Sequence, residues 1–599
     1  MKTSFIKKMV TFIVMAFLLQ MNISFLATAN VDSDSFKNTN INLEKWTKTL
    51  EFSPPQIYDN KDSVSIFVEE ATYYTQQTGQ PRLPYSSITK SFPLGTRIKD
   101  ISCTYSDVVQ INLDKPVELS PNLSWHGVQR NPDDKLVSLN DDIVSHQWFS
   151  YHLGGGLDSG EHVTFLSILL FPVQYDSEKT TLNYINEIKI TVLYEPSVNK
   201  LTLQDTYPFV IIAPSIFKLP LQRLVDHKTE NGLTTKLVTL RDIYKGKYFP
   251  VEGYDKPEKI KYFIKNAVEQ WGTEYILLIG SIKKLPMRAS LFGDFSIFTD
   301  MYYADLYFDD GGFCNWDSNG NHIYGEYWHD NKKDLVDLYA DVYLGRLPCQ
   351  NILEVFIVVN KIIRYESQTH DDWWDKIILV GGDTFPGWNG NEGEMTNDFI
   401  EEVLPDFNHV RIRTSDGTFN IDYINQEVSK GARFFEYSGH GFECGMGTYA
   451  PNGENLILYN TDDMGGMRNS YKLPVAFFDA CLTAKLDYTL GEYLNHPKLF
   501  KMLFPVYAWY WVKKINGGAI ASVGATEVAF SFVGENGPRG GAGYLSLHFF
   551  EGYHSCDTVS EMLVYSQNVY LNNLWKDHWT IEQFTLIGDP TLKVGDNFE

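Results

Sequence analysis

From residue 207 onward, short apolar runs alternate with amphipathic segments, and this order limits the chain to few folds. Each apolar run is long enough for one buried strand, and the segments between the runs repeat apolar residues at helical spacing. Buried strands separated by helices form a largely parallel sheet that is covered on both faces. We therefore predict an α/β fold. The predicted strands are residues 209–212, 275–279, 377–380, 410–413, 434–437, 475–478 and 519–523, and the clearest helices are 260–271 and 352–365.

Residues 30–206 have a different pattern. Short runs in which apolar and polar residues alternate, such as 64–68 and 188–192, are separated by Gly, Pro, Asn and Asp clusters. This pattern is typical of an all-β domain. The change near residue 206 marks a domain boundary, and we divide the chain beyond it into two α/β subdomains, 207–375 and 376–599.

The chain begins with a pattern typical of an export signal. Lys7 and Lys8 precede an apolar run that ends in the small residues 27–29. Gln20 and Asn22 interrupt this run, which favours a cleaved signal peptide at 1–29 over a membrane anchor. No later run is apolar enough to span a bilayer, so we expect a secreted, extracellular protein.

Charge and cysteine content exclude further classes. The net charge of -24 argues against nucleic acid as a partner, because its phosphates select basic surfaces, and it suits basic substrates. Six cysteines without paired spacing do not indicate a disulfide framework, and a thiol kept in an exported chain is a candidate for chemistry. The glycine-rich stretch 534–543 lacks the ending of a phosphate-binding loop, so we expect no organic cofactor and a mobile loop there.

Two predicted strands end in turns that carry reactive side chains. The strand 434–437 runs into a Ser-Gly-His-Gly turn at His440, and the strand 475–478 runs into Asp-Ala-Cys at Cys481. Since the carboxyl ends of parallel strands share one edge of a sheet, both side chains should meet there. Alone, the Gly-His-Gly sequence is as often structural as functional, but the pair at successive strand ends favours a functional site.

The pair has the chemistry of acyl transfer. A thiol attacks an acyl carbon only as the thiolate, so Cys481 needs a partner that lowers its pKa from about 8.5, and His440 is the obvious base. The backbone N–H groups of Gly441 and Cys481 are candidate donors for the developing oxyanion. Zinc held by these residues and Cys444 is the weaker alternative, because a fourth ligand is lacking nearby.

Four separated motifs, at 344–348, 437–441, 479–481 and 587–592, together resemble the gingipain-type cysteine peptidases of the caspase-like clan. The resemblance covers about residues 207–594. It implies a caspase-like sandwich with a largely parallel sheet in two subdomains, preceded by an all-β prodomain. It also implies cleavage after Arg or Lys. It further implies a zymogen whose prodomain is the inhibitor until the joint, the polar segment 195–206 between the two parts, is cut, with Lys200 as a candidate cut site. This chain shows no match to the carboxyl-terminal immunoglobulin-like domain of the best-known members.

The resemblance also implies roles for acidic residues. An ungapped match places Asp383 where the family orients its histidine, and Glu394 at the base of the pocket for a basic side chain. Glu394 is equally an ordinary helix start, where acidic residues favour the dipole. Asp479, Thr526 and Phe530 are candidate pocket walls.

A second constellation, at residues 317–326, alternates oxygen-bearing side chains and ends in a carboxylate. This is what Ca²⁺ requires of a tight loop, although the glutamate comes at position ten rather than at the twelve of an EF-hand. An Asx-rich turn is the alternative. The predicted ligands of a structural calcium ion are Asp317, Asn319, Asn321, Ile323 and Glu326.

The leading hypothesis is a secreted cysteine endopeptidase, made as a zymogen, that cleaves protein or peptide substrates after Arg or Lys. One alternative is a peptidase of the same fold with a preference for Asn or Asp. The other is a secreted binding scaffold that keeps the fold without turnover.

Overall fold

The computed structural model describes residues 43–77, 79–120, 123–125, 147–197, 206–293, 295–329, 332–368, 373–451, 453–487, 506–574 and 577–595. All of these from Glu44 onward belong to one compact unit. The predicted signal peptide and the candidate cut site Lys200 lie outside the described residues.

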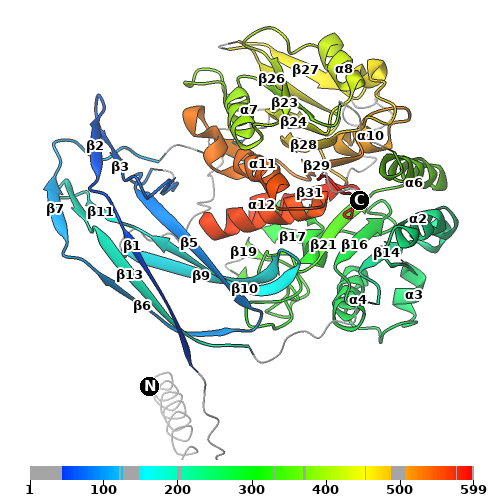
Figure 1. Cartoon of the computed structure of the whole chain (residues 1–599), viewed down its shortest axis with the longest axis horizontal. Coiled ribbons are helices and arrows are strands. Elements are labelled where there is room, and N and C mark those ends of the chain that lie inside the picture. The colour runs from blue at the N-terminus through cyan, green and yellow to red at the C-terminus, as the bar shows by residue number, and fades with distance from the viewer. Residues whose placement is uncertain are drawn as a thin grey trace, which may run out of the picture. The chain divides into compact units, whose positions relative to one another are not determined.

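A ten-stranded sheet forms the centre of the α/β part (Figure 1). Its strand order is β15 (Thr235–Thr239), β14 (Phe209–Ala213), β16 (Tyr275–Ile279), β21 (Tyr343–Leu347), β31 (Phe584–Ile587), β29 (Ala521–Ala525), β28 (Val475–Asp479), β24 (Phe434–Ser438), β22 (Lys376–Gly381) and β23 (Asn408–Arg413). Neighbouring strands are parallel except β29 and β31. The central strands β14, β24 and β28 are buried along their whole length, as strands covered on both faces must be. The predicted fold class is confirmed.

The C-terminal strand β31 joins the two halves of this sheet, because it lies between β21 of the first half and β29 of the second. Gly588 donates its N–H to the carbonyl of Arg346 at 2.9 Å. A Cβ placed on Gly345 would lie 2.5 Å from the carbonyl oxygen of Gly588, so only glycine fits there. Asp589 forms a buried ion pair with Lys228 at 2.9 Å. Two of the motifs found in the sequence therefore hold the sheet together.

Helices cover both faces of the sheet. On one face lie α7 (Glu392–Val403), α11 (Gly541–Glu551) and α12 (Val559–Asn573), and α11 contacts both of the others. On the other lie α2 (Lys218–Glu230), α6 (Ile352–Glu366) and α10 (Tyr507–Lys513). Alternate residues of β24 show the two faces, because Glu436 bonds to α7 and α11 whereas Phe435 packs on Trp511 of α10.

Local signals explain where elements begin and end. Helix α4 (Lys256–Trp271) starts four residues before the predicted 260, because the side chain of Asp255 caps it by accepting from the N–H of Glu258. Strand β29 starts later than predicted, because the N–H groups of Ala519 and Ile520 bond to Trp511 and Pro474 outside the ladder. The predicted loop at 534–543 is wrong, since this stretch forms the 3₁₀ helix η4 (Gly534–Arg539) and the first turn of α11.

The described part of the N-terminal domain consists of strands, as predicted. They are β1 (Glu44–Glu51), β13 (Glu187–Glu195) and β6 (Arg97–Tyr105); β4 (Tyr73–Tyr74), β5 (Pro84–Pro93), β10 (Glu161–Leu170) and β9 (Phe149–Asp158); β11 (Val173–Asp176), β12 (Thr181–Tyr184) and β7 (Val109–Asn112); and β2 (Gln56–Asp59) and β3 (Val64–Phe67). Helix α12 contacts β5 and β10, and Ser167 donates to Asn572 at 2.8 Å.

Smaller elements complete the described chain. They are η1 (Ser215–Phe217), α3 (Leu240–Tyr244), β17 (Arg288–Phe292), β18 (Phe295–Thr299), α5 (Met301–Ala304), β19 (Tyr327–His329), β20 (Lys332–Lys333), α8 (Ile421–Lys430), β25 (His440–Phe442), β26 (Gly445–Tyr449), β27 (Leu456–Asn460), η2 (Asp463–Gly466), η5 (Gly552–His554) and α13 (His578–Gln583), with β8 and β30 introduced below. None of the described helices has both the length and the apolar character that a bilayer span requires.

Candidate active site

The turns at the ends of β24 and β28 lie against each other. The two strands are parallel neighbours with Ser438 opposite Asp479, and Gly439 donates its N–H to the carbonyl of Asp479 at 3.2 Å. A Cβ placed on Gly441 would lie 2.2 Å from the carbonyl oxygen of Cys481 and 2.8 Å from its nitrogen. Only glycine permits this approach. The structure thus brings the turn that carries His440 onto the backbone of Cys481.

His440 is half-buried, and its ring is held on three sides. Nε2 lies 2.7 Å from the carbonyl oxygen of Thr384. Phe385 and Tyr449 pack edge-to-face on the ring, with centroids 6.0 and 5.7 Å away. A carbonyl oxygen only accepts hydrogen bonds, so Nε2 carries the proton and Nδ1 is the basic nitrogen of the neutral imidazole.

The thiol of Cys481 is fully buried in this conformation. Sγ donates to the carbonyl oxygen of Ala529 at 3.3 Å and accepts from the N–H of the same residue at 3.2 Å. Burial raises the pKa of the Cys481 thiol well above its ordinary value, and the nearby Asp479 and Glu527 raise it further. The covered thiol is therefore protonated, and a thiol in this form is a poor nucleophile.

The residue that contacts the Cys481 thiol directly precedes a strand that is paired with the N-terminal domain. Ala529 directly precedes β30 (Phe530–Phe532), and β30 pairs antiparallel with β8 (Leu123–Trp125). Phe530, predicted as a pocket wall, is a buried residue of this strand, opposite Trp125. Thr526 is buried just after β29, and its N–H donates to the carbonyl of Gln583 at 2.9 Å.

The predicted acidic residues occupy different places. Asp383 is buried, exchanges two backbone hydrogen bonds with Tyr449, and directly precedes Thr384. Glu394 is also buried, but its carboxylate accepts from the N–H of Ser415 at 2.9 Å, just beyond β23. Strands β22 and β24 separate β23 from the strand that leads to Cys481. Asp383 thus lies at the histidine, whereas Glu394 lies toward the sheet edge.

Asp479 lies against helix α11, since a Cβ placed on Gly543 would be 3.5 Å from its Oδ2, and it has a neighbour that sequence reasoning missed. Its carboxyl accepts from the hydroxyl of Ser438 at 2.6 Å, and burial raises its pKa to about 7. On the adjacent strand, Glu436 accepts from Ser546 at 3.4 Å and from Asn397, and burial raises its pKa well above the ordinary value. Asp479 raises it further. The signal in the sequence was a charge inside an otherwise apolar strand.

A second missed residue, Glu392, binds the segment beside the histidine. One of its oxygens accepts from the N–H groups of Thr384 and Phe385, at 3.1 and 3.2 Å, and the other accepts from the N–H of Gly534 at 2.7 Å. Its position at a helix start gave no sign of these contacts.

The predicted calcium loop is closed by its own hydrogen bonds. Asn319 and Asn321 donate through their side-chain amides to Glu326, at 2.7 and 2.6 Å. Asp317 accepts from two backbone N–H groups of the loop, and Asp334, which the sequence did not indicate, accepts from Ser318 at 2.9 Å. Within the described ranges no three His, Cys, Asp or Glu side chains converge as metal ligands. For calcium to bind, the side-chain amides of Asn319 and Asn321 would have to turn so that their oxygens, and not their NH₂ groups, lie on the side of Glu326 and face the ion.

The fold and the paired turns define an α/β protein with a thiol and an imidazole at one edge of a parallel sheet. A family model described as Peptidase family C25 matches residues 202–595, and the chain belongs to this family. Family membership confirms two predictions, that the chain is related to the gingipains and that it is a cysteine-type peptidase.

The relatives share limited identity with the chain. Gingipain R2 of Porphyromonas gingivalis is 22% identical over 288 residues, which are 47% of this chain and 33% of the relative. Gingipain R1 of the same organism is 21% identical over 356 residues, 53% of this chain and 31% of the relative. The chain therefore spans about a third of the length of these relatives. A crystal structure of the Arg-specific cysteine proteinase gingipain R matches with a TM-score of 0.48 and 19% identity, covering 66% of this chain and 80% of that one.

Proposed function

We propose that the chain is a secreted cysteine endopeptidase, made as a zymogen, with Cys481 as nucleophile and His440 as general base. The contact of Gly441 with the backbone of Cys481 carries the proposal, because it brings the two turns to one edge of the sheet. Membership of Peptidase family C25 supports it.

The proposed reaction begins when Cys481 becomes accessible. Nδ1 of His440 takes the thiol proton, and the carbonyl of Thr384 stabilises the imidazolium through Nε2. The thiolate attacks the peptide carbonyl carbon, while the N–H groups of Gly441 and Cys481 hold the oxyanion. His440 then protonates the leaving amine. Water, deprotonated by His440, attacks the thioester and restores the thiol.

We place basic side chains first among the substrates. The net charge of -24 attracts cations, and the buried carboxyl of Asp479 lies two residues before the nucleophile. Asp383 is the candidate for orienting His440, and Glu394 stays a candidate for the pocket.

Latency is proposed to come from the N-terminal domain. Its strand β8 binds β30, and the residue before β30 covers the thiol. Cleavage of the joint near residue 200 would release this cover, and a structural Ca²⁺ in the loop 317–326 remains part of the proposal.

The deciding experiment compares the wild-type chain with Cys481→Ala and His440→Ala. Each is cut at the joint and then incubated with Arg- and Lys-terminated fluorogenic peptides under reducing conditions. Turnover by the wild type and its loss in both variants would support the peptidase. Full activity in Cys481→Ala would refute it. No turnover together with no reaction of Cys481 with a thiol-directed affinity label would favour a binding scaffold, and release after Asn or Asp would favour the alternative specificity.

A further inference from the structure

Glu392 is the first residue of α7, yet its carboxylate binds two other segments. It is 2% exposed, so its hydrogen bonds are made away from water. Oε2 accepts from the consecutive N–H groups of Thr384 and Phe385, and Oε1 accepts from the N–H of Gly534. A carboxylate that served only the helix dipole would not need these partners.

The two residues that Glu392 binds are those that hold the imidazole of His440. The carbonyl of Thr384 accepts from Nε2, and the ring of Phe385 packs edge-to-face on the imidazole. The peptide planes on both sides of Thr384 are therefore fixed, one by its N–H on Glu392 and the other by the N–H of Phe385 on the same oxygen. A shift of this segment would move the carbonyl that selects the tautomer of His440.

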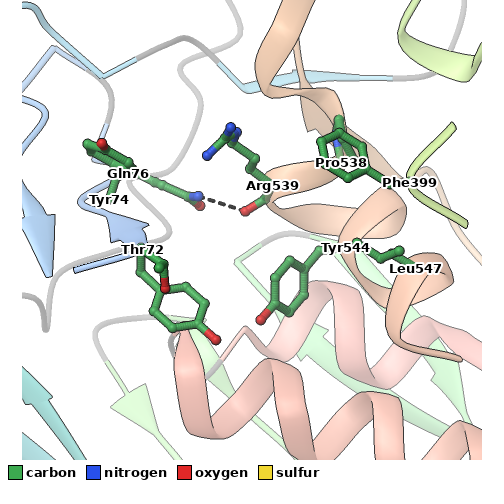
Figure 2. Close-up of a pocket in the computed structure, with 9 residues that line it drawn as sticks. Thr72, Tyr74, Gln76, Phe399, Pro538, Arg539, Tyr544 and Leu547 are labelled. Atoms are coloured by element: carbon green, nitrogen blue, oxygen red, sulfur yellow. Dashed lines mark hydrogen bonds between the residues drawn. The ribbon is translucent and has the colours of Figure 1, made fainter. Parts of the chain in front are cut away.

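The other oxygen of Glu392 reaches the element on which the N-terminal domain rests. Gly534 begins η4, and a Cβ on Gly537 of η4 would lie 3.2 Å from the Cβ of Glu392. Figure 2 shows Gln76 of the N-terminal domain bonded to the carbonyl of Arg539 at the end of η4, at 2.7 Å. Arg82 donates to Asn536 of the same element at 3.0 Å.

We infer that Glu392 is a positioning residue for His440, acting through Thr384 and Phe385, and that it couples the histidine to the seat of the N-terminal domain on η4. The inference rests on the proposed role of His440. Burial raises the pKa of the Glu392 carboxyl, as does the nearby Asp383, and the hydrogen bonds from backbone N–H groups oppose this rise.

The test uses the full chain with histidine labelled with ¹⁵N in the imidazole. The signal of His440 is assigned by its loss in His440→Gln, and its nitrogen shifts report the tautomer and the titration midpoint. In the wild type we expect the tautomer with the proton on Nε2. Glu392→Gln offers one acceptor oxygen in place of two, so the segment at Thr384 is held less firmly. We therefore expect a mixture of His440 tautomers and a titration midpoint of His440 at lower pH. Glu402→Gln, an exposed change in the same helix, should match the wild type.

A kinetic measurement on the chain cut at the joint adds a second readout. Glu392→Gln should lower kcat about 10–100-fold with little change in KM, because a positioned acid–base group contributes ~10²–10⁴-fold. Glu392→Asp keeps the charge but cannot span both segments, and it should change both readouts in the same direction.

A purely structural role predicts a different result. Glu392→Gln would then lower the thermal midpoint but leave the tautomer and titration of His440 as in the wild type, which would overturn the inference. Failure of both Glu392 variants to fold would also count against it. The NMR readout does not require turnover, so activity persisting in Cys481→Ala would refute the proposed peptidase mechanism separately.

Discussion

Ala529 binds the thiol of Cys481 through both of its backbone groups, accepting from Sγ through its carbonyl at 3.3 Å and donating to it through its amide at 3.2 Å. We expect the intact chain to react slowly with iodoacetamide at Cys481, because the buried thiol stays protonated through neutral pH. Cutting the joint should expose the Cys481 thiol and lower its pKa. A fall of one pKa unit raises the thiolate population tenfold, so the alkylation rate should rise by about tenfold or more. Peptide mass after timed quenching measures the rate. Equal rates before and after the cut would show that the cover is not the source of latency.

The pairing of β8 with β30 gives a second way to test the cover. Ser124 lies opposite Ser531 in this antiparallel pair. Ser124→Pro removes a backbone N–H and restricts the chain, so it should weaken the pairing and speed alkylation of Cys481 in the uncut chain. Ser124→Ala keeps the N–H and is the matched control. A proline variant that alkylates no faster than the alanine variant would mean that β8 does not hold β30 in place.

Substrate preference should depend on Asp479 more than on Glu394. Both carboxyls accept hydrogen bonds in the uncut chain, that of Glu394 from Ser415 and Thr414 and that of Asp479 from Ser438. Asp479 lies two residues before Cys481, whereas Glu394 lies toward the sheet edge. Asp479→Asn should therefore reduce kcat/KM for Arg and Lys peptides about tenfold relative to Asn peptides, since a charge-assisted hydrogen bond contributes about 1.5–3 kcal/mol. Glu394→Gln should change this ratio less. A positional peptide library measures both, and a selective loss in Glu394→Gln alone would assign the pocket to Glu394.

Much of the fold could be predicted from the sequence because its signals are local. Apolar runs identified the strands around the site. Because the carboxyl ends of parallel strands share one edge of a sheet, the sequence also predicted that the turns carrying His440 and Cys481 lie together. Strand β21 was not predicted as a strand, since it contains Arg346, whose buried guanidinium is paired with Asp300 at 2.7 Å. A pattern of apolar residues does not reveal a charge that is neutralised by a residue 46 positions away.

The rest of the site depends on contacts that no local pattern encodes. Thr384 acts through its backbone carbonyl and Ala529 through both of its backbone groups, so their side chains carry no signal. Glu392 resembles any acidic residue at a helix start. Strand β8 could not be predicted from its own residues, because its pairing partner β30 lies more than 400 positions further along the chain.

Stability should fall with rising pH because of the carboxyls of Asp479 and Glu436. Burial raises the pKa of both in the folded protein, to about 7 for Asp479, whereas unfolded carboxyls titrate near 4. The folded state therefore binds more protons between these values. The stability that these two carboxyls contribute is fully present below about pH 4 and is lost as the pH rises toward 7. Asp479→Asn should remove a cost on the order of a few kcal/mol at pH 8 and only about a third of that cost at pH 5. Urea unfolding at both pH values tests this, with Glu402→Gln as the exposed control, and a pH-independent effect of Asp479→Asn would contradict it.

Calcium binding to the loop 317–326 should appear as a gain in stability, because an ion that binds only the folded chain stabilises it by mass action. The buried Glu326 accepts from Asn319 and Asn321, and these are the groups that calcium would rearrange. We expect the thermal midpoint to rise with added Ca²⁺ and to fall with a chelator. Glu326→Gln removes the charge while it keeps an acceptor, so it should abolish the response to calcium, and Mg²⁺ should act less well because it prefers a smaller, octahedral site. A thermal midpoint that is the same in calcium and in chelator would leave the loop as an Asx-rich turn, in which the hydrogen bonds to Asp317 and Glu326 are sufficient by themselves.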